Sequence, residues 1–283
     1  MNVLLTGSHG LVGSALTPAL TANGHKVTPL SHSQPWPELA GHDTVVHLAG
    51  ENIAAGRWTP QKKARIRDSR VEMTRQLCET VTKLSPPPRV VVSASAVGFY
   101  GNRSDEVLRE ESAPGAGFLA EVCRDWEAAT KPAADAGIRV VNLRFGVILS
   151  PENGALAKLL MPFKLGLGGG LGDGRQWMSW IALDDALSVI GRALADDALR
   201  GPVNVVAPEP VTNRDFTRTL ARVLRRPAIF PVPAFALQLA LGEMADALLL
   251  SSQRTEPAKL ALIGYRFRLP TLEGSLRHLL NSR

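Results

Sequence analysis

Cysteine is scarce in this chain. The 283 residues contain only Cys78 and Cys123, which is too few for a disulfide framework or a cysteine zinc site. The six histidines show no paired spacing with carboxylates or cysteines that is typical of a metal site. We therefore predict a protein without a bound metal, located in the reducing cytoplasm.

Long hydrophobic runs are also missing. No stretch of about 18 consecutive apolar residues occurs, and Met1 leads into a strand-like run without the basic segment of a signal peptide. The sequence therefore predicts no association with a membrane. A hydrophobic content of 45% and a charged content of 20% are ordinary for a globular protein with a large core.

Acidic residues are under-represented near the C-terminus. Residues 214–283 contain eleven Lys/Arg and five Asp/Glu, whereas residues 1–213 contain twenty-one of each. Aromatic residues are few in this basic segment and its arginines alternate with apolar helix positions, which argues against a nucleic-acid interface. The pattern favours solvated helix faces or an anionic small-molecule ligand.

Short apolar runs alternate with amphipathic stretches along the first 210 residues. Helical periodicity occurs at 11–23, 59–83, 118–136 and 183–196. The runs between them have the length of buried strands and lie at 3–6, 26–30, 44–48, 89–93, 139–143 and 203–206. This alternation predicts an α/β fold with a Rossmann-type, doubly wound parallel sheet.

The sequence pattern changes after about residue 210, and we expect two domains. Residues 1–210 form the nucleotide-binding domain, with some insertions of the substrate lobe after 150, and residues 211–283 form a smaller, mostly helical C-terminal lobe. Thr212 and Asp215 have the spacing of a helix start, and residues 234–250 read as one long apolar helix. The glycine-rich residues 166–174 are typical of a mobile surface loop.

The first strand leads into a glycine turn, VLLTGSHGLVGSA at residues 3–15. Glycines at 7, 10 and 13 allow a tight turn, an approach of a pyrophosphate and close packing of helix on strand. The amides and the positive dipole end of the following helix would face the phosphates. We therefore predict a dinucleotide site formed by Gly7, Ser8, Gly10, Leu11, Val12 and Gly13.

The end of the second strand bears on which nucleotide is bound. An acidic residue about twenty positions beyond the glycines is typical of NAD sites, but no Asp or Glu occurs between Gly13 and Glu38. Ser31, His32 and Ser33 are instead suited to hydrogen-bond a 2′-phosphate. This favours NADP over NAD, although His32 is equally interpretable as an exposed loop residue.

Several segments together resemble the extended short-chain dehydrogenase/reductase superfamily: TGSHGLVGS (6–14), HLAGENI (47–53), SASAVGFYG (93–101) and LRFGVILS (143–150). More narrowly, GRWTPQKKARIRDSR (56–70), FLAEVCRDWE (118–127), GRQWMSWI (174–181) and the segment from about 230 to 283 resemble its atypical epimerase-like subfamily with a small C-terminal domain. The resemblance implies an NAD(P)-binding Rossmann domain and a C-terminal substrate lobe. It also implies cofactor contacts at Leu48, Ala49, Gly50, Ser93, Arg144 and Gly146.

The superfamily's proton-transfer pair is missing from this chain. Members use a Ser or Thr together with a Tyr and a Lys four residues later, because a phenol with a pKa near 10 needs help to act at neutral pH. The only tyrosines, Tyr100 and Tyr265, are followed four residues later by Ser104 and Leu269. Aligning the expected helix on Glu127 puts Leu119 and Cys123 at the Tyr and Lys positions.

Other side chains are candidates for the proton transfer that the missing Tyr–Lys pair would perform. Ser95 matches the superfamily's catalytic Ser, with Ser93 as the less favoured choice. Glu121 is a candidate acid or base if buried, and Tyr100 either reaches the substrate or caps the pocket. Cys123 is either a reactive thiol or, more typically, a small packed hydrophobe.

Three charged residues are candidates for contact with the substrate. Glu51 follows the third strand and is placed to point into the site. Arg175, beside the glycine-rich loop, and Arg57 carry forked guanidinium groups suited to an anion. Trp177 and Trp180 are interpreted as packing residues rather than stacking platforms, and His47 as a hydrogen-bonded core residue.

Two functions remain open at this point. The first is an NADP-dependent oxidoreductase or epimerase-like enzyme acting on a small, anionic substrate, with an unusual proton donor. The second is a catalytically silent NADP-binding sensor whose cofactor stabilises one conformation. Apolar side chains such as Leu119 around the nicotinamide would favour the sensor. The sequence leaves monomer and homodimer open.

Overall fold

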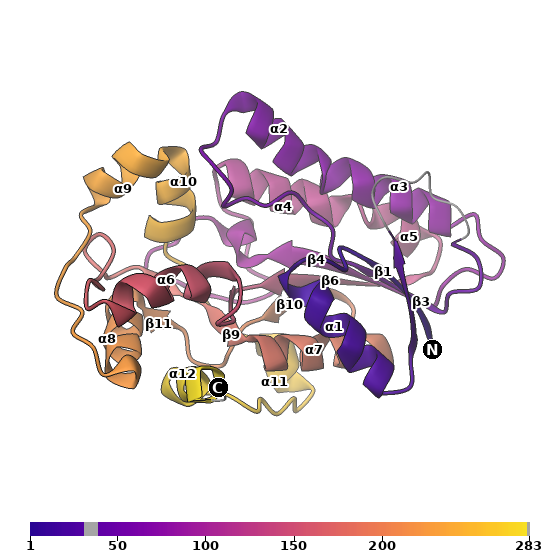
Figure 1. Cartoon of the computed structure of the whole chain (residues 1–283). Coiled ribbons are helices and arrows are strands. Elements are labelled where there is room, and N and C mark those ends of the chain that lie inside the picture. The colour runs from indigo at the N-terminus through magenta and orange to yellow at the C-terminus, as the bar shows by residue number, and fades with distance from the viewer. Residues whose placement is uncertain (31–38, 282–283) are drawn as a thin grey trace.

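Six parallel strands form the centre of the molecule (Figure 1). The computed structural model describes residues 1–30 and 39–281, and Ser31, His32 and Ser33 lie outside the described residues. In space the strands follow the order β10-β6-β4-β3-β1-β2. Their bounds are β1 Asn2–Thr6, β2 Lys26–Leu30, β3 Thr44–His47, β4 Val90–Ala96, β6 Arg139–Phe145 and β10 Gly201–Val205.

The strand order reverses beside β1. The chain passes from β1 to β2 on one side, then crosses to β3 and continues outward through β4, β6 and β10. Ligands of open α/β sheets bind beyond the carboxyl ends of the strands where the order reverses. The fold therefore directs a ligand to the ends of β1 and β3, next to Thr6 and His47.

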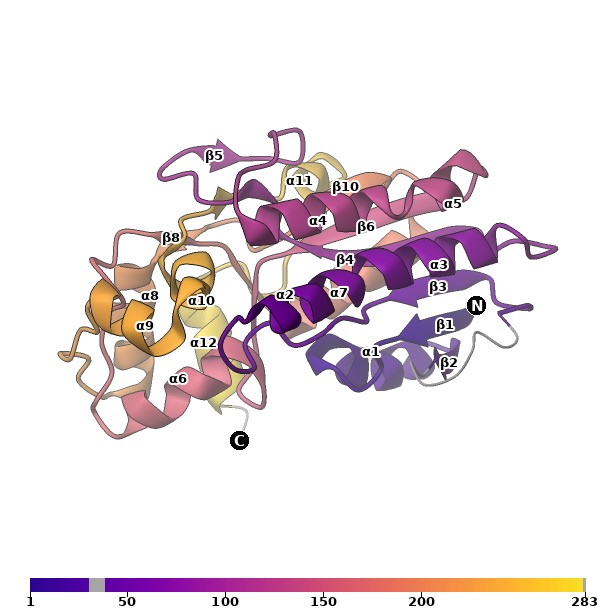
Figure 2. The same cartoon turned by 90° about the horizontal axis from the view of Figure 1, so that it is seen from above.

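Helices cover both faces of the sheet, which makes it doubly wound (Figure 2). On one face α1 (Leu11–Ala22) and α7 (Leu183–Ala195) pack on Leu5, whereas α3 (Val71–Val81) and α5 (Lys131–Asp135) pack on Leu4. Successive residues of a strand point to opposite faces, so neighbouring apolar residues supply two separate cores. The predicted fold class is confirmed.

A second core forms beyond the sheet. It brings α6 (Gly154–Lys164) together with α8 (Asn213–Leu224) and α12 (Leu272–Asn281). The chain then returns to the sheet through α11 (Ala258–Leu262), where Leu260 is fully buried in the sheet core. Packing thus interleaves the two regions, and the domain boundary near residue 210 stays a prediction.

Three of the expected helical stretches are interrupted. Residues 59–83 form α2 (Pro60–Asp68) and α3, and residues 118–136 form α4 (Phe118–Ala128) and α5. Residues 234–250 are not one helix but α9 (Ala234–Leu241), α10 (Glu243–Ala245) and a π-helical turn, η2 (Asp246–Leu250), with a break at Gly242. The predicted helix start at Thr212 is confirmed, because its side chain accepts a hydrogen bond from the amide of Asp215.

Short strand pairs and one 3-10 turn complete the structure. The turn η1 (Val97–Tyr100) directly follows β4. The pairs are β5 (Val107–Leu108) with β12 (Arg254–Thr255), β7 (Val147–Leu149) with β9 (Trp180–Ala182), and β8 (Trp177–Met178) with β11 (Val211–Thr212). No helix in the described ranges is long and apolar enough to span a membrane.

The glycine-rich segment 166–174 differs from the expected free loop. Its backbone exchanges hydrogen bonds with residues 230–232, including Gly172 N–H to the Val232 carbonyl at 2.9 Å. Leu171 N–H also donates to the buried side chain of Asn213 at 2.8 Å. The glycines serve close packing, since a Cβ on Gly169 would lie 1.9 Å from the Phe230 carbonyl oxygen.

Candidate functional site

The glycine turn lies at the point where the strand order reverses. Gly7 has a φ of +72°, and a Cβ there would lie 2.6 Å from the carbonyl carbon of Leu48 at the end of β3. A Cβ on Gly13 would lie 2.2 Å from the Gly7 carbonyl oxygen. Both contacts are with backbone that cannot move aside, so these two positions require glycine. Gly10 has more room, with a Cβ contact of 3.4 Å.

The N-terminus of α1 is open to an anion. Its N-cap is Gly10, which provides no side-chain acceptor, and no acidic residue stands in the first turn. The first amides of a helix have no acceptor within the helix, so those of Leu11, Val12 and Gly13 remain available. By contrast, α2 and α8 are capped by Thr59 and Thr212. A phosphate of a dinucleotide fits this end of α1.

The end of β3 packs against this glycine turn. Leu48, Ala49 and Gly50 follow the strand, and the Ala49 amide donates to the buried Thr6 hydroxyl at 3.3 Å. His47 bridges the hydroxyls of Thr6 (2.7 Å) and Thr74 (2.9 Å) and is fully buried. It is the hydrogen-bonded core histidine that the sequence indicated.

Arg70 is a neighbour of this strand end that sequence reasoning missed. Its guanidinium donates to the carbonyl oxygens of Glu51 (3.1 Å) and Ile66 (3.2 Å). A Cβ on Gly50 would lie 3.0 Å from its Cζ. Burial lowers the pKa of Arg70, and it forms no ion pair with the carboxylates of the described ranges. The only signal was its position at the end of the segment GRWTPQKKARIRDSR.

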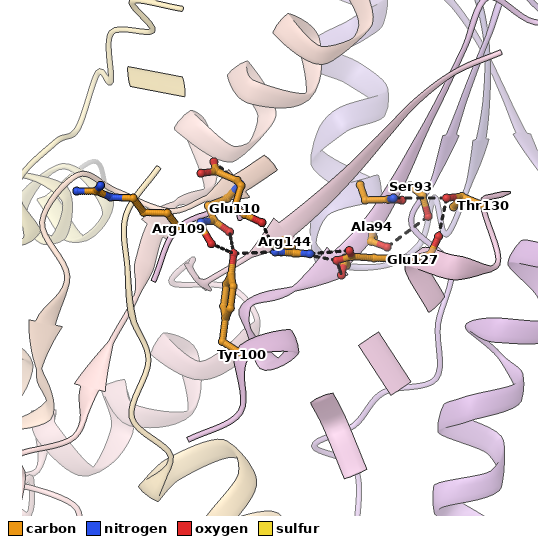
Figure 3. Close-up of polar contacts among 11 residues, drawn as sticks. Ser93, Ala94, Tyr100, Arg109, Glu110, Glu127, Thr130 and Arg144 are labelled. Carbon is orange, nitrogen blue, oxygen red and sulfur yellow. Dashed lines mark hydrogen bonds and ion pairs between the residues drawn. The ribbon is translucent and has the colours of Figure 1, made fainter. Parts of the chain in front are cut away.

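The carboxyl ends of β4 and β6 carry a buried polar network (Figure 3). Arg144 donates to both carboxylate oxygens of Glu127, at 2.7 and 2.8 Å. It also donates to the Tyr100 hydroxyl at 2.8 Å and to the Glu110 carbonyl at 3.1 Å, and it lies 3.5 Å from the ring centroid of Phe99. Burial opposes its charge, but the hydrogen bonds to Glu127 outweigh burial and raise the pKa of Arg144.

This network engages the donors of Arg144, and the predicted cofactor role of that residue stays a prediction. The side chain is 3% exposed, and its donors are directed to Glu127, Tyr100 and Glu110. Gly146, also expected at the cofactor, serves packing as well, because a Cβ there would lie 2.5 Å from the Ser179 carbonyl oxygen. The cofactor contacts that the resemblance implies for both residues stay predictions.

Tyr100 is not placed as a catalytic residue. It is fully buried, and its hydroxyl lies 2.7 Å from Asn204 Oδ1 and 2.9 Å from the Arg109 carbonyl oxygen. Burial raises the pKa of Tyr100 to about 12 despite the opposing effect of Arg144. A phenol with this pKa and these partners is a structural donor in the network.

Ser95 belongs to the same network. It is 3% exposed, and its hydroxyl donates to Glu127 Oε1 at 2.7 Å. Ser93 is fully buried, and its hydroxyl lies 3.3 Å from the Ala94 carbonyl oxygen. Ser95 remains the better match to the superfamily's catalytic Ser, but its hydroxyl already donates a hydrogen bond to Glu127.

The helix that should carry the Tyr–Lys pair presents apolar groups instead. A Cβ on Gly98 in η1 would lie 3.6 Å from Leu119 Cβ and 3.8 Å from Cys123 Sγ. Burial raises the pKa of the Cys123 thiol to about 12, so it packs as a hydrophobe. Glu121 is exposed on α4 and fails the condition of burial that its acid–base role required.

The three proposed substrate contacts lie in different surroundings. Glu51 forms an ion pair with Lys62 at 2.5 Å, and this hydrogen bond lowers the pKa of Glu51. Arg57 is exposed, with Nη2 3.4 Å from where a Cβ of Gly242 would lie. Arg175 lines a separate groove with Trp177. Trp180 is fully buried and donates to the Glu209 carbonyl at 3.0 Å, which confirms its packing role.

The parallel sheet, the order reversal and the glycine turn together define a Rossmann-type dinucleotide-binding protein. Comparison with known proteins gives the family. Residues 3–207 match the NAD dependent epimerase/dehydratase family, and residues 232–279 match a domain of unknown function, DUF1731. This chain belongs to the NAD dependent epimerase/dehydratase family.

Similar proteins cover the chain from end to end. An epimerase family protein of Mycobacterium tuberculosis is 42% identical over 97% of this chain and 96% of its own. The crystal structure of human epimerase family protein SDR39U1 (isoform 2) with NADPH superposes with a TM-score of 0.95 at 33% identity, covering 100% of both chains. A nucleoside-diphosphate sugar epimerase from Corynebacterium glutamicum is 43% identical with a TM-score of 0.81, covering 58% of that chain.

Proposed function

We propose that this chain binds NADPH at the glycine turn and works as a cofactor-responsive binding protein. The observation that carries the proposal is the cradle of Gly7 and Gly13 against the end of β3, beneath an uncapped helix N-terminus. The NADPH in the similar human structure supports this cofactor. The amides of Leu11 and Val12 would hold the pyrophosphate, and Arg70 would add positive charge beside Gly50.

When bound, NADPH supplies a hydride donor at the nicotinamide. The described side chains near the ends of β4 and β6 lack a free proton donor to accompany it. Ser95 donates to Glu127, Glu127 is held by Arg144, and Cys123 is a buried thiol. Leu119 stands beside η1 where the superfamily has a tyrosine. This arrangement favours the silent sensor over the enzyme.

The binding part of the proposal is tested by calorimetric titration with NADPH, NADH and their oxidised forms at fixed salt. We expect NADPH to bind at least about tenfold more tightly than NADH, because a 2′-phosphate adds charge-assisted hydrogen bonds. Ligand at about 100 times its Kd should raise the free energy of unfolding by about 2.7 kcal/mol. Failure of all four nucleotides to bind would overturn the proposal.

An NADPH-dependent oxidoreductase or epimerase acting on an anionic substrate is the second candidate. Ser95 favours it, since its sequence context resembles that of the superfamily's catalytic Ser. The test is NADPH oxidation with a panel of carbonyl compounds and sugar nucleotides. The sensor predicts no turnover that depends on Ser95. Turnover that is lost in Ser95→Ala, with NADPH affinity unchanged, would establish the enzyme instead.

A further inference from the structure

The Arg70 side chain lies between the end of β3 and helix α4. The residue directly precedes α3, which lies beside α4 on one face of the sheet (Figure 2). Its Cζ atom is 5.1 Å from the ring centroid of Trp126 on α4. Its charge also acts on Cys123, because burial raises the pKa of that thiol to about 12 and Arg70 opposes the rise. The alignment on Glu127 assigns the superfamily's missing lysine to Cys123, so Arg70 brings a cation to this neighbourhood from another helix.

Gly50 makes room for this guanidinium group. A Cβ on Gly50 would lie 3.0 Å from Arg70 Cζ and 3.2 Å from each of its Nη atoms. The end of a long side chain moves more easily than backbone, so a larger residue at position 50 would displace the guanidinium. Gly50 comes two residues after Leu48, whose carbonyl carbon meets the position of a Cβ on Gly7. The guanidinium therefore lies close to the point where β3 meets the glycine turn.

Only one nitrogen of Arg70 is used within the protein. Nη1 donates to the carbonyl oxygens of Glu51 and Ile66 and lies 3.5 Å from the Ser69 hydroxyl. An arginine has five N–H donors, and those of Nε and Nη2 have no acceptor in the part of the chain that the structure describes. The side chain is partly buried, and a charge held away from water without a partner costs free energy. These donors are therefore suited to a ligand that brings its own oxygen atoms.

The guanidinium is held in place before any ligand binds. Trp126 supports it from α4 by a cation–π contact. The indole N–H of Trp126 donates to the buried Thr74 hydroxyl at 2.9 Å, so the ring is fixed as well. With the Nη1 hydrogen bonds on the other side, Arg70 loses little conformational freedom when a ligand arrives.

The strand order determines which half of a dinucleotide would lie beside Arg70. The strands β2, β1, β3 and β4 follow one another along the sheet. The adenosine half is expected at the end of β2 and the pyrophosphate at the turn after β1. The other half, the nicotinamide with its ribose, then extends past the end of β3 toward β4. This is the side of the turn on which Arg70 lies.

We propose that Arg70 binds the ribose on the nicotinamide side of NADPH through its Nε and Nη2 donors. The two hydroxyl oxygens of a ribose stand on adjacent carbons, so a planar fork of N–H donors can reach both. The inference rests on the proposed binding of NADPH and adds the half of the nucleotide that the side chain contacts. Arg70 thus fixes the position of the nicotinamide, whereas the glycine turn fixes that of the phosphates.

Calorimetric titration of the full chain with NADPH and two fragments tests this contact. The fragment 2′,5′-ADP ends at the first phosphate, and the 2′-phosphate of ADP carries both phosphates but no second ribose. In Arg70→Gln we expect NADPH to bind at least about tenfold more weakly, because charge-assisted hydrogen bonds are strong. Both fragments should keep their affinities, which also shows that the variant is folded. The control is Arg75→Gln, since Arg75 is exposed on α3 and pairs with Glu72 at 3.4 Å; it should leave all three affinities unchanged.

Gly50→Ala tests the same contact without removing the charge. The added carbon displaces the guanidinium, so we expect NADPH to bind more weakly and the fragments to bind as before. In the Arg70→Gln background, Gly50→Ala should have little further effect, because two substitutions that act through one contact are not additive. A full effect of Gly50→Ala in that background would mean that position 50 acts on the nucleotide directly, and would contradict the role given to Gly50.

Two outcomes would overturn the ribose contact while leaving the proposed function intact. The first is an NADPH affinity in Arg70→Gln equal to that of the unaltered chain. The second is equal weakening of NADPH and of the 2′-phosphate of ADP, which would assign the charge of Arg70 to the pyrophosphate. Failure of the unaltered chain to bind NADPH would overturn both the proposed function and this inference.

Discussion

The two ends of one sheet edge are built on different principles. Around β1 and β3 the candidate site is made of backbone: glycines at 7 and 13, open helix amides and residues 48–50. Around β4 and β6 it is made of charged side chains that bind one another, centred on Arg144 and Glu127. The first end keeps space and donors for a ligand, whereas the second uses its donors internally.

This difference shows that a cofactor site made of backbone tolerates substitutions that alter a neighbouring reactive site made of side chains. Backbone amides persist through every substitution except proline, and steric demands fix Gly7 and Gly13. Side chains at the neighbouring strand ends are free to exchange roles. Here Tyr100 is a buried hydrogen-bonding partner of Asn204 and Arg144.

The largest effect on stability is expected from a substitution in the charged network at the carboxyl ends of β4 and β6. Arg144→Gln leaves the Glu127 carboxylate, whose side chain is 11% exposed, without its partner, and should lower the free energy of unfolding by about 3–5 kcal/mol. Urea unfolding measures this loss. Arg124→Gln removes an exposed pair with Asp125 and should cost at most about 1 kcal/mol.

The same variant tests the predicted cofactor role of Arg144. If the side chain is structural, the folded fraction of Arg144→Gln should bind NADPH within a few-fold of the unaltered chain. Weakening by more than about tenfold, about 1.4 kcal/mol, in protein that is still folded would place Arg144 at the cofactor site.

A substitution in the glycine turn should reduce NADPH affinity more than it reduces the stability of the fold. In Gly13→Ala the added carbon would meet the Gly7 carbonyl oxygen at 2.2 Å, so α1 must shift away from the turn. We expect NADPH affinity to fall at least about a hundredfold, or about 2.7 kcal/mol, in a calorimetric titration.

Gly191→Ala is the matched control for this substitution. Gly191 also lies within a helix, α7, but nothing is within 4 Å of its added carbon. Its replacement should stabilise the protein by about 0.5–1 kcal/mol and leave NADPH affinity unchanged. Equal loss of NADPH affinity in Gly13→Ala and Gly191→Ala would contradict the proposed binding of NADPH at the glycine turn.

A smaller effect concerns the buried thiol of Cys123. Burial raises the pKa of Cys123 to about 12, whereas an unfolded thiol titrates near 8.5. Between these values only the unfolded state loses its proton, so stability is complete below about pH 8.5 and falls as pH rises toward 12. Each thiol contributes up to about 1.4 kcal/mol per pH unit.

Unfolding by urea at pH 8 and pH 10 measures this dependence. Cys78 shares the direction, since burial raises the pKa of its thiol to about 12 as well. Cys123→Ala should therefore flatten the profile by about half of the thiol contribution. A profile that is unchanged in this variant would mean that Cys123 is accessible to solvent.

Sequence reasoning succeeded where a pattern is local. The six strands and the helix start at Thr212 were predicted from apolar runs and from one capping side chain. It was less accurate for 234–250, where apolar composition continues across a break at Gly242. The hydrogen bonds that residues 166–174 form with 230–232 were not predicted, because that segment lies some sixty residues further along the chain.

By itself, the sequence determined the parallel sheet, the glycine turn and the absence of a Tyr-x-x-x-Lys pair. Each of these depends on residue type and short spacing alone. Only the tertiary structure decided the surroundings of Tyr100, Arg144, Glu121 and Arg70, because burial and hydrogen bonding depend on partners brought together by folding. Tyr100 meets Asn204 across more than a hundred residues, and only the packed chain makes that hydroxyl a structural group rather than a reactive one.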